Sequence, residues 1–162
     1  MTGPRIGSME IGNVVSGRRR TLTLARALAL SGGAFDNPGW PDRNLHTDAK
    51  VAAATGLAEI VVSGTQWEGY LVGLLVELIG VGWFAGGELD IKIPRSVRIG
   101  DTVQPHARLV AINKDDRADP ERRAMAATLV SLEVWCENGE GQQVMVGTAR
   151  CTIPDVDDSL HA

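Results

Sequence analysis

The sequence predicts a single α+β domain in which a mostly antiparallel sheet wraps one long, very apolar helix. Between residues 65 and 84, apolar side chains cover nearly every face of a helix, which is typical of a helix buried in a core. From residue 88 to residue 153, apolar and polar residues mostly alternate, as they do in half-buried strands. The chain of 162 residues fits one domain, 1–162, and we place its folded core at about 15–154.

The composition argues against nucleic-acid and membrane partners. The net charge is -4, from 20 acidic and 16 basic residues, and no broad basic face is available to neutralise a phosphate backbone. The one basic run, 18–20, is interpreted as a solvated edge rather than as an anion site. Glu68 and Glu77 interrupt the apolar helix, so the uncharged stretches that remain are too short to span a bilayer.

The two cysteines indicate neither a metal site nor a disulfide framework. Cys136 and Cys151 are too few and too far apart for either, and both fall in alternating segments, so we expect buried, reduced thiols. We expect no metal and no cofactor. Residues 1–13 lack the apolar stretch of a secretory signal, so the cytoplasm is the expected compartment. Thirteen arginines against three lysines indicate a GC-rich coding sequence and favour a bacterial source.

The first part of the chain predicts a short strand and two helices around a loop. Residues 21–30 favour a short strand that passes into a helix. Asp48 is a good N-cap for the Ala-rich stretch that follows, and Gly56 is a good terminator, so a second helix is expected between them. The loop 32–47 connects the two helices.

The central helix is followed by strands. Gly69 and Gly73 lie one turn apart, so we expect the sheet to approach the helix closely along that stripe. The segment 89–93 alternates as a strand and ends at Pro94. The segment 102–113 alternates again, with one apolar face, and its proline indicates an edge or a bulge. The residues of that face are Val103, Ala107, Leu109 and Ala111, and the proline is Pro105.

The last part of the chain predicts an antiparallel meander. The charged run 114–123 contains a proline and is interpreted as a solvated loop. A strand over 130–136, a hairpin signal at Asn138-Gly139 and a strand over 144–153 follow it.

Candidate chemistry gathers in the loop before the second helix. Asp42, Asn44 and His46 place a carboxylate, an amide and an imidazole close together in the chain. Such a set can orient and deprotonate a water molecule, because imidazole titrates near neutral pH. The alternative is that Asp42 and Asn44 are turn residues and that His46 only precedes a helix cap.

A second candidate is the start of the central helix at Ser63-Gly64. Uncovered N–H groups at the positive end of a helix dipole can stabilise an oxygen that gains negative charge. The alternative is an ordinary N-cap formed by Ser63 or Thr65.

Taken together, the order of elements and several motifs resemble the hot-dog fold of the MaoC-like hydratase and dehydratase family, which includes R-specific enoyl-CoA hydratases. The family has a stretch of the form Asp-x-Asn-Pro-x-His-x-Asp, an Ala-containing helix and then His-Gly at the head of the core helix. The similar segments here are 42–48, the helix over 49–56, the Pro-Val-Gly-Asp turn within 93–102, and the last hairpin within 137–149. The resemblance covers about 21–154.

The resemblance implies a site and a substrate class. Asp42 and His46 would take the places of the catalytic pair, and the Gly64 amide would polarise a thioester carbonyl. Asn44, Ser63 and Trp67 would contact the substrate. The substrate would be an acyl thioester, of the 2-enoyl or 3-hydroxyacyl type, on coenzyme A or a carrier protein, and the protein would be a homodimer or a higher homo-oligomer.

Two departures from the family pattern keep other functions open. The proline after Asn44 is missing, so Asp42 lies one residue nearer to His46, and Ser63 replaces the histidine before Gly64. Asp36 belongs to a second Asp-Asn-Pro run in a different register. The alternatives are a non-catalytic hot-dog protein for acyl binding or assembly, and a hot-dog thioesterase.

Overall fold

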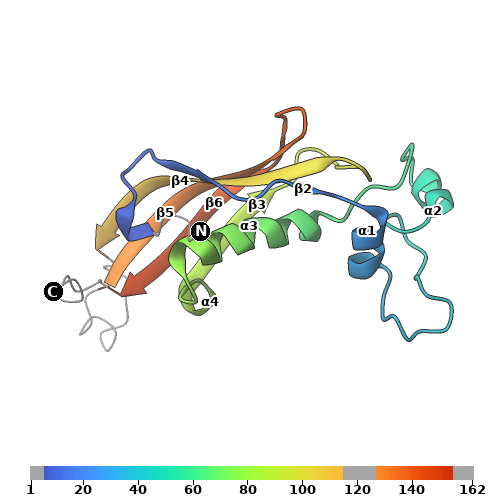
Figure 1. Cartoon of the computed structure of the whole chain (residues 1–162), viewed down its shortest axis with the longest axis horizontal. Coiled ribbons are helices and arrows are strands. Elements are labelled where there is room, and N and C mark those ends of the chain that lie inside the picture. The colour runs from blue at the N-terminus through green and yellow to red at the C-terminus, as the bar shows by residue number, and fades with distance from the viewer. Residues whose placement is uncertain (1–5, 115–126, 155–162) are drawn as a thin grey trace.

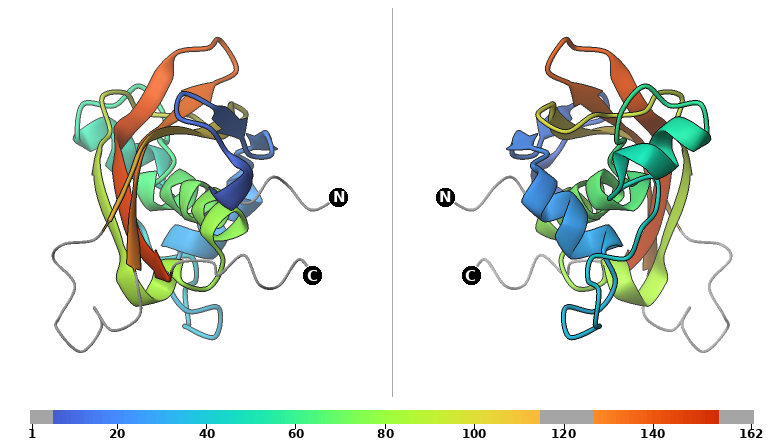
Figure 2. Two further views of the ribbon diagram at one scale, coloured as in Figure 1. Left: turned by 90° about the vertical axis from the view of Figure 1, so that its left-hand side faces the viewer. Right: turned by 90° about the vertical axis from the view of Figure 1, so that its right-hand side faces the viewer.

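The computed structural model describes residues 6–114 and 127–154, which form one antiparallel sheet curled around one long helix (Figures 1 and 2). The strands are β1 (Val14–Ser16), β2 (Arg20–Thr21), β3 (Gly87–Lys92), β4 (Thr102–Lys114), β5 (Ala127–Asn138) and β6 (Gln143–Pro154). The helices are the short 3-10 turn η1 (Ile6–Ser8), α1 (Leu24–Ser31), α2 (Ala49–Ala54), α3 (Gly64–Ile79) and α4 (Trp83–Gly86). The strand order is β1-β4-β5-β6-β3, and β2 continues the β1 edge along β4. The predicted α+β class and the wrapped helix are confirmed.

The core forms where one face of α3 meets the concave face of the sheet. The buried side chains of α3 recur at helical spacing and are listed here: Trp67, Leu71, Leu74, Leu75 and Leu78. They pack against apolar residues of the long strands, among them Val103, Leu109, Leu132, Val134 and Met145. The contact removes the large apolar side chains of the facing surfaces from water, which stabilises the packing of the helix on the sheet.

The glycine stripe of α3 does not face the sheet, contrary to the sequence-based expectation. Gly69 and Gly73 are exposed, and a Cβ atom added at either would meet nothing within 4 Å. By helical spacing, both glycines fall on the side of α3 opposite to the buried positions 67, 71, 74 and 75. The helix also ends earlier than predicted, because Gly80 adopts a φ of 84°, and the residues after it form the separate α4.

Strand β4 tolerates Pro105 because the sheet edge beside it is interrupted there. Pro105 O accepts a hydrogen bond of 2.8 Å from Gly17 N, in the gap between β1 and β2. A strand residue directs its N and O to the same side, so the missing N–H of Pro105 falls in that gap. The register also shifts between Leu109 and Ala111, and this bulge moves Ala111 off the apolar face to which the alternation had assigned it.

The β5–β6 hairpin forms where the sequence predicts it, but with a longer turn. Asn138 N donates to Gln142 O at 2.9 Å, and the Asn138 side chain accepts from the N–H groups of Glu140 and Gln142. The positive φ of 75° belongs to Gly141, not to Gly139. The asparagine signal is therefore correct for the hairpin and wrong for the turn type.

The predicted helices before the core helix are both present. The Thr23 side chain caps α1 by accepting from Arg26 N, and β2 precedes it as a two-residue strand. Asp48 caps α2, and Gly56 follows it with a φ of 86°. Both helices lie beyond the N-terminal end of α3, away from the long strands (Figure 1).

The two cysteines are buried free thiols, as predicted. Burial raises the pKa of the Cys136 thiol to about 12 and also raises the pKa of the Cys151 thiol. Of the charged run 114–123, only Lys114 falls within the described residues, as the end of β4. Among the described helices, none is both long and apolar enough to cross a bilayer.

The packing of α3 makes a testable distinction between its two faces. Leu75 is fully buried, so Leu75→Asp should lower the free energy of unfolding by at least about 3 kcal/mol, because the carboxylate has no partner in an apolar interior. Gly73→Ala should instead raise it by about 0.5–1 kcal/mol, since alanine favours the helix and its Cβ meets open space. Urea denaturation measures both. A destabilised Gly73→Ala protein, or a Leu75→Asp protein as stable as the parent, would contradict this assignment.

Candidate functional site

Asn44 organises the loop that carries the candidate residues. Its Nδ2 donates to Ser31 O at 2.7 Å, which ties the loop to the end of α1. Its Oδ1 accepts from His46 N at 2.8 Å, and its backbone O accepts from Thr47 N and Asp48 N. The donor and acceptor ends of the amide are fixed by these partners, because a carbonyl only accepts and an N–H only donates. Asn44 is therefore a structural hub of the loop.

His46 is held against the strand-like segment that leads into α3. Its Nδ1 lies 2.8 Å from Val61 O, three residues before Gly64. A carbonyl oxygen can only accept, so Nδ1 carries the hydrogen, and in the neutral ring Nε2 keeps its lone pair. The fold thus presents His46 as the tautomer whose Nε2 can accept a proton.

Asp42 is not joined to His46 within the described residues. Its side chain is exposed, and its carboxylate lies against Gly33, where a Cβ would clash with it. The backbone of Asp42 is fixed by hydrogen bonds from its N to Gly32 O and from Thr47 Oγ1 to its O, at 2.8 and 2.5 Å. The loop therefore positions the main chain of Asp42, while its carboxylate points to the α1 side of the loop.

Asp48, the second aspartate of the motif, acts as a helix cap. Its Oδ1 accepts from Lys50 N at 2.8 Å and from Val51 N at 3.2 Å, and Arg43 Nε lies 3.2 Å from its Oδ2. The hydrogen bond from Lys50 N, followed by that from Val51 N, lowers the pKa of this carboxyl. Asp48 is committed to structure rather than to proton transfer.

The start of α3 is anchored by the segment before β4. Val62 N donates to Val97 O at 2.8 Å, and Val61 and Arg98 form an isolated antiparallel bridge. Ile93 also lies close to the helix start, because a Cβ at Gly64 would meet the terminal methyl group of its side chain. This end of the helix is thus placed by the single segment that connects β3 to β4.

Ser63 occupies the N-cap position of α3 but does not cap it. Its side chain makes no capping hydrogen bond, and its Oγ lies 2.8 Å from Thr65 Oγ1 instead. No acidic residue is present in the first turn. The ordinary N-cap interpretation of Ser63 is therefore wrong, and the positive end of the helix dipole is left to act on another group.

Trp67 lies in the core. It is 1% exposed and packs within the buried cluster, although its indole N–H has no hydrogen-bond partner among the described residues. A Cβ atom added to Gly64 would lie 3.8 Å from the Trp67 ring, so the ring packs close to the first residue of the helix. The structure thus places Trp67 in the core beneath the start of α3. It is not on the surface, where a substrate contact was expected.

Residues 35–40 of the loop, which contain the second Asp-Asn-Pro run, form a small cluster of their own. Asp36 is exposed, and the rings of Phe35 and Trp40 pack at a centroid distance of 5.0 Å. Among the described residues, no group of three or more histidine, cysteine or acidic side chains is placed to hold a metal ion.

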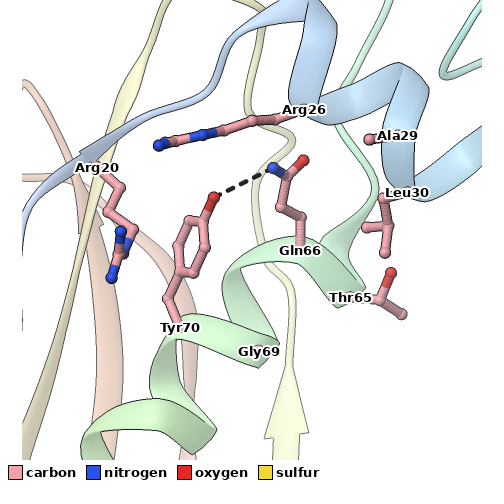
Figure 3. Close-up of a pocket in the computed structure, with 8 residues that line it drawn as sticks. All are labelled: Arg20, Arg26, Ala29, Leu30, Thr65, Gln66, Gly69 and Tyr70. Carbon is pink, nitrogen blue, oxygen red and sulfur yellow. Dashed lines mark hydrogen bonds between the residues drawn. The ribbon is translucent and has the colours of Figure 1, made fainter.

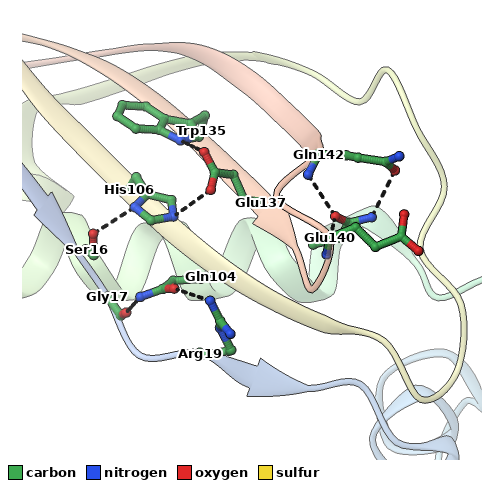
Figure 4. Close-up of polar contacts among 10 residues, drawn as sticks. Ser16, Gly17, Arg19, Gln104, His106, Trp135, Glu137, Glu140 and Gln142 are labelled. Carbon is green, nitrogen blue, oxygen red and sulfur yellow. Dashed lines mark hydrogen bonds and ion pairs between the residues drawn. The ribbon is translucent and has the colours of Figure 1, made fainter.

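A polar cluster that the sequence does not single out lies on the outer face of the sheet (Figure 4). Ser16 Oγ lies 2.8 Å from His106 Nδ1, and the His106 ring stacks on Trp135 at 5.1 Å. Trp135 Nε1 donates to Glu137 at 2.8 Å, while His106 Nε2 lies 3.8 Å from the same carboxylate, too far for a hydrogen bond.

We interpret this cluster as a structural link between β1 and β4 rather than as a catalytic site. Desolvation lowers the pKa of His106, and the charge of Glu137 opposes that shift only in part. The ring is therefore neutral near pH 7, and its contribution to stability is present above about pH 6.5 and declines as the pH falls. Its role is to hold the short β1 onto β4.

Solved structures of known proteins share this fold, although the sequence comparisons found no relative. No family model matches this sequence, and no curated protein matches it. The structure is similar to the MaoC-like dehydratase from Rhodospirillum rubrum, with a TM-score of 0.68 and 20% identity over 94% of this chain and 97% of that chain. It is also similar to the (R)-hydratase from A. caviae involved in PHA biosynthesis, with a TM-score of 0.63 and 19% identity over 91% of this chain and 98% of that chain.

A third similar structure supplies the name of the fold. It is a conserved hypothetical protein from Mycobacterium tuberculosis that has a double hot-dog fold. The TM-score is 0.68 and the identity 18%, over 97% of this chain and 46% of that chain. The fold is therefore the hot-dog fold, and it is shared with MaoC-like dehydratases and R-hydratases.

The Asn44 hub can be tested separately from any activity. Asn44→Asp keeps an oxygen for His46 N but replaces the donor to Ser31 O with a second oxygen at about the same place, so the two acceptors repel. We expect faster hydrogen exchange of amides in 42–48 and little change in the β4–β6 amides. Asn37→Asp, at an exposed position of the same loop, is the control. Equal exchange in the two variants would mean that the Asn44–Ser31 bond does not hold the loop.

Proposed function

We propose that this protein is a hydratase or dehydratase of acyl thioesters, acting on 2-enoyl or 3-hydroxyacyl groups carried by coenzyme A or a carrier protein. The observation that carries the proposal is the bond from His46 Nδ1 to Val61 O, which leaves Nε2 as the proton acceptor beside the segment entering α3. The hot-dog fold shared with a dehydratase and an (R)-hydratase supports the same class.

In the hydration direction, His46 Nε2 accepts a proton from water as the water oxygen attacks the β-carbon of the enoyl group. The electron pair moves to the thioester oxygen, and the enolate then takes a proton at its α-carbon from the acid of the Asp42–His46 pair, which returns the proton accepted from water and regenerates the pair. The N–H of Gly64, at the positive end of the α3 dipole, would stabilise that oxygen. Ser63 leaves this helix end uncapped, which suits the role. Asp42 and His46 would share the acid and base roles, with Asn44 fixing the loop.

One observation favours a second candidate. The exposed Asp42 carboxylate lies against Gly33, and no contact joins it to His46 within the described residues. A loop with this geometry also fits a hot-dog protein that binds acyl groups without hydrating them. The two candidates differ in one measurable respect, the turnover of an enoyl thioester.

The catalytic pair gives the central test. Asp42→Asn and His46→Gln should each lower the turnover of enoyl thioesters at least about a hundredfold, because an amide cannot transfer a proton in place of either group. The assay follows purified protein with a panel of enoyl thioesters of different chain lengths, and circular dichroism checks folding. Asp36→Asn, at an exposed position of the same loop, should leave turnover unchanged.

Other outcomes of this series are informative. Loss of activity in Asp36→Asn with full activity in Asp42→Asn would place the catalytic carboxylate in the other register of the loop. A parent protein that hydrates no enoyl thioester of any length, yet binds acyl groups, would support the non-catalytic candidate.

We also propose that the protein is a homodimer that pairs at the β3 edge. Within the described part of the chain, β3 pairs only with β6, so its other edge is unpaired. Phe84, on the adjoining α4, is 74% exposed. An unpaired strand edge beside an apolar side chain favours association with a second copy.

Sedimentation velocity at micromolar concentration tests this association. The parent should sediment as a dimer or a larger oligomer, and Phe84→Asp should shift it towards monomer. Phe35→Asp is the matched control, because Phe35 is 68% exposed but lies in the distant loop. A monomeric parent would contradict the proposal.

A further inference from the structure

An open pocket of about 540 Å³ lies where β2, α1 and α3 meet, next to the candidate site (Figure 3). We call it the arginine pocket, and its lining residues are Arg20, Arg26, Ala29, Leu30, Thr65, Gln66, Gly69 and Tyr70. Its rim consists of exposed residues, whereas Gln66 lies deeper. Thr65 directly follows Gly64, so the pocket adjoins the helix end assigned above to the thioester oxygen.

Gln66 carries an unpartnered polar atom into this pocket. It is 9% exposed, its Nε2 donates to Tyr70 Oη at 3.1 Å, and its Oε1 has no hydrogen-bond partner among the described residues. Reversing the amide would let Oε1 accept from the phenol and would leave Nε2 without a partner instead. In either orientation one buried amide atom lacks a partner, which is costly unless a ligand group pairs with it. A secondary amide satisfies both cases, because it offers a donor and an acceptor.

Two arginines supply positive charge to the same pocket. Arg26 Nη1 donates to Thr21 O at 2.8 Å, and the Arg20 guanidinium lies 5.2 Å from the centre of the Tyr70 ring. In Figure 3 both guanidinium groups lie on the Tyr70 side of the pocket. Within 6–114 and 127–154, neither arginine forms an ion pair with a carboxylate. Planar guanidinium groups with unused N–H donors are well suited to bind phosphate.

We infer that the arginine pocket binds the phosphopantetheine arm of the substrate, with its phosphate at Arg20 and Arg26 and one of its amides at Gln66. This inference rests on the proposed acyl-thioester chemistry and adds the site that holds the carrier. The arm joins a phosphate to two secondary amides and ends in the sulfur of the thioester. That combination matches the charge at the rim, the unpaired amide inside and the neighbouring Gly64. Coenzyme A and carrier proteins both present this arm.

Calorimetric titration with unreactive thiol ligands tests the pocket without any turnover. The parent should bind 4′-phosphopantetheine at least about tenfold more tightly than pantetheine, which lacks the phosphate, and the difference should shrink in high salt. Equal affinity for the two ligands would overturn the inference.

Substitutions localise the contacts. Arg20→Gln and Arg26→Gln should each weaken 4′-phosphopantetheine binding about tenfold and leave pantetheine binding unchanged, which is the range of a charge-assisted hydrogen bond. Gln66→Leu should weaken both ligands by a similar factor. Arg18→Gln is the matched control, because Arg18 is exposed in the same basic run but does not line the pocket. An Arg18→Gln effect as large as that of Arg20→Gln would indicate general charge attraction and overturn the site.

The outcome for the pocket is distinguishable from the outcome for the activity. Phosphate-dependent binding that needs Arg20 and Arg26, in a protein that hydrates nothing, would retain the pocket and reject the hydratase. Hydration with an unchanged KM in both arginine variants would retain the hydratase and reject the pocket. Tight binding of coenzyme A but not of a holo carrier protein would assign the source of the arm to coenzyme A, and the reverse result would assign it to the carrier protein.

Discussion

The burial of one face of α3 against the curved sheet is the interaction on which the rest of the structure depends. The large side chains of that face recur at 67, 71, 74, 75 and 78, and the long strands β4, β5 and β6 supply the apolar partners. A helix buried on one face has a fixed axis and a fixed rotation, so its first turn is also fixed. This packing therefore also fixes where α3 starts at Gly64. It fixes the Val61–Val62 segment before the helix and the pocket beside Gln66 as well.

Most of the fold follows from periodicity, because helix and strand repeats are local properties of the sequence. The cap at Asp48 and the hairpin at Asn138 are equally local, and the structure contains both of them. What the sequence could not supply was orientation. The apolar residues of α3 cover nearly the whole helix, so the pattern did not show which stripe faces the sheet, and the glycines were placed on the wrong side. The end of the helix was missed for a related reason, since Gly80 breaks it through a positive φ within an apolar run.

The candidate site was harder to predict because its residue types serve structure and chemistry equally well. Asn44, Thr47 and Asp48 satisfy backbone groups of the loop and of α2, as polar residues in turns and caps commonly do. Among these loop residues, only His46 combines a fixed ring with a nitrogen left for another partner. The pocket at Arg20 and Arg26 was missed because its residues come from three elements, and the basic run alone is more typical of a solvated edge.

The tether on His46 also explains how the loop can lack the proline of the related motif and still orient the imidazole. His46 is held at two points: Asn44 Oδ1 accepts from its backbone N, and Val61 O accepts from Nδ1 of its ring. The Asn44 contact brackets the position of the missing proline, whereas the Val61 contact does not depend on it. The Asn44 contact spans two residues and closes a local turn, and the Val61 contact belongs to the segment that the core holds through α3. Because Val61 O holds Nδ1 from outside the loop, Nε2 of His46 stays free while the Asp42 carboxylate lies against Gly33. Because the two residues are positioned by different parts of the fold, the imidazole can keep its orientation while the carboxylate loses or changes its role.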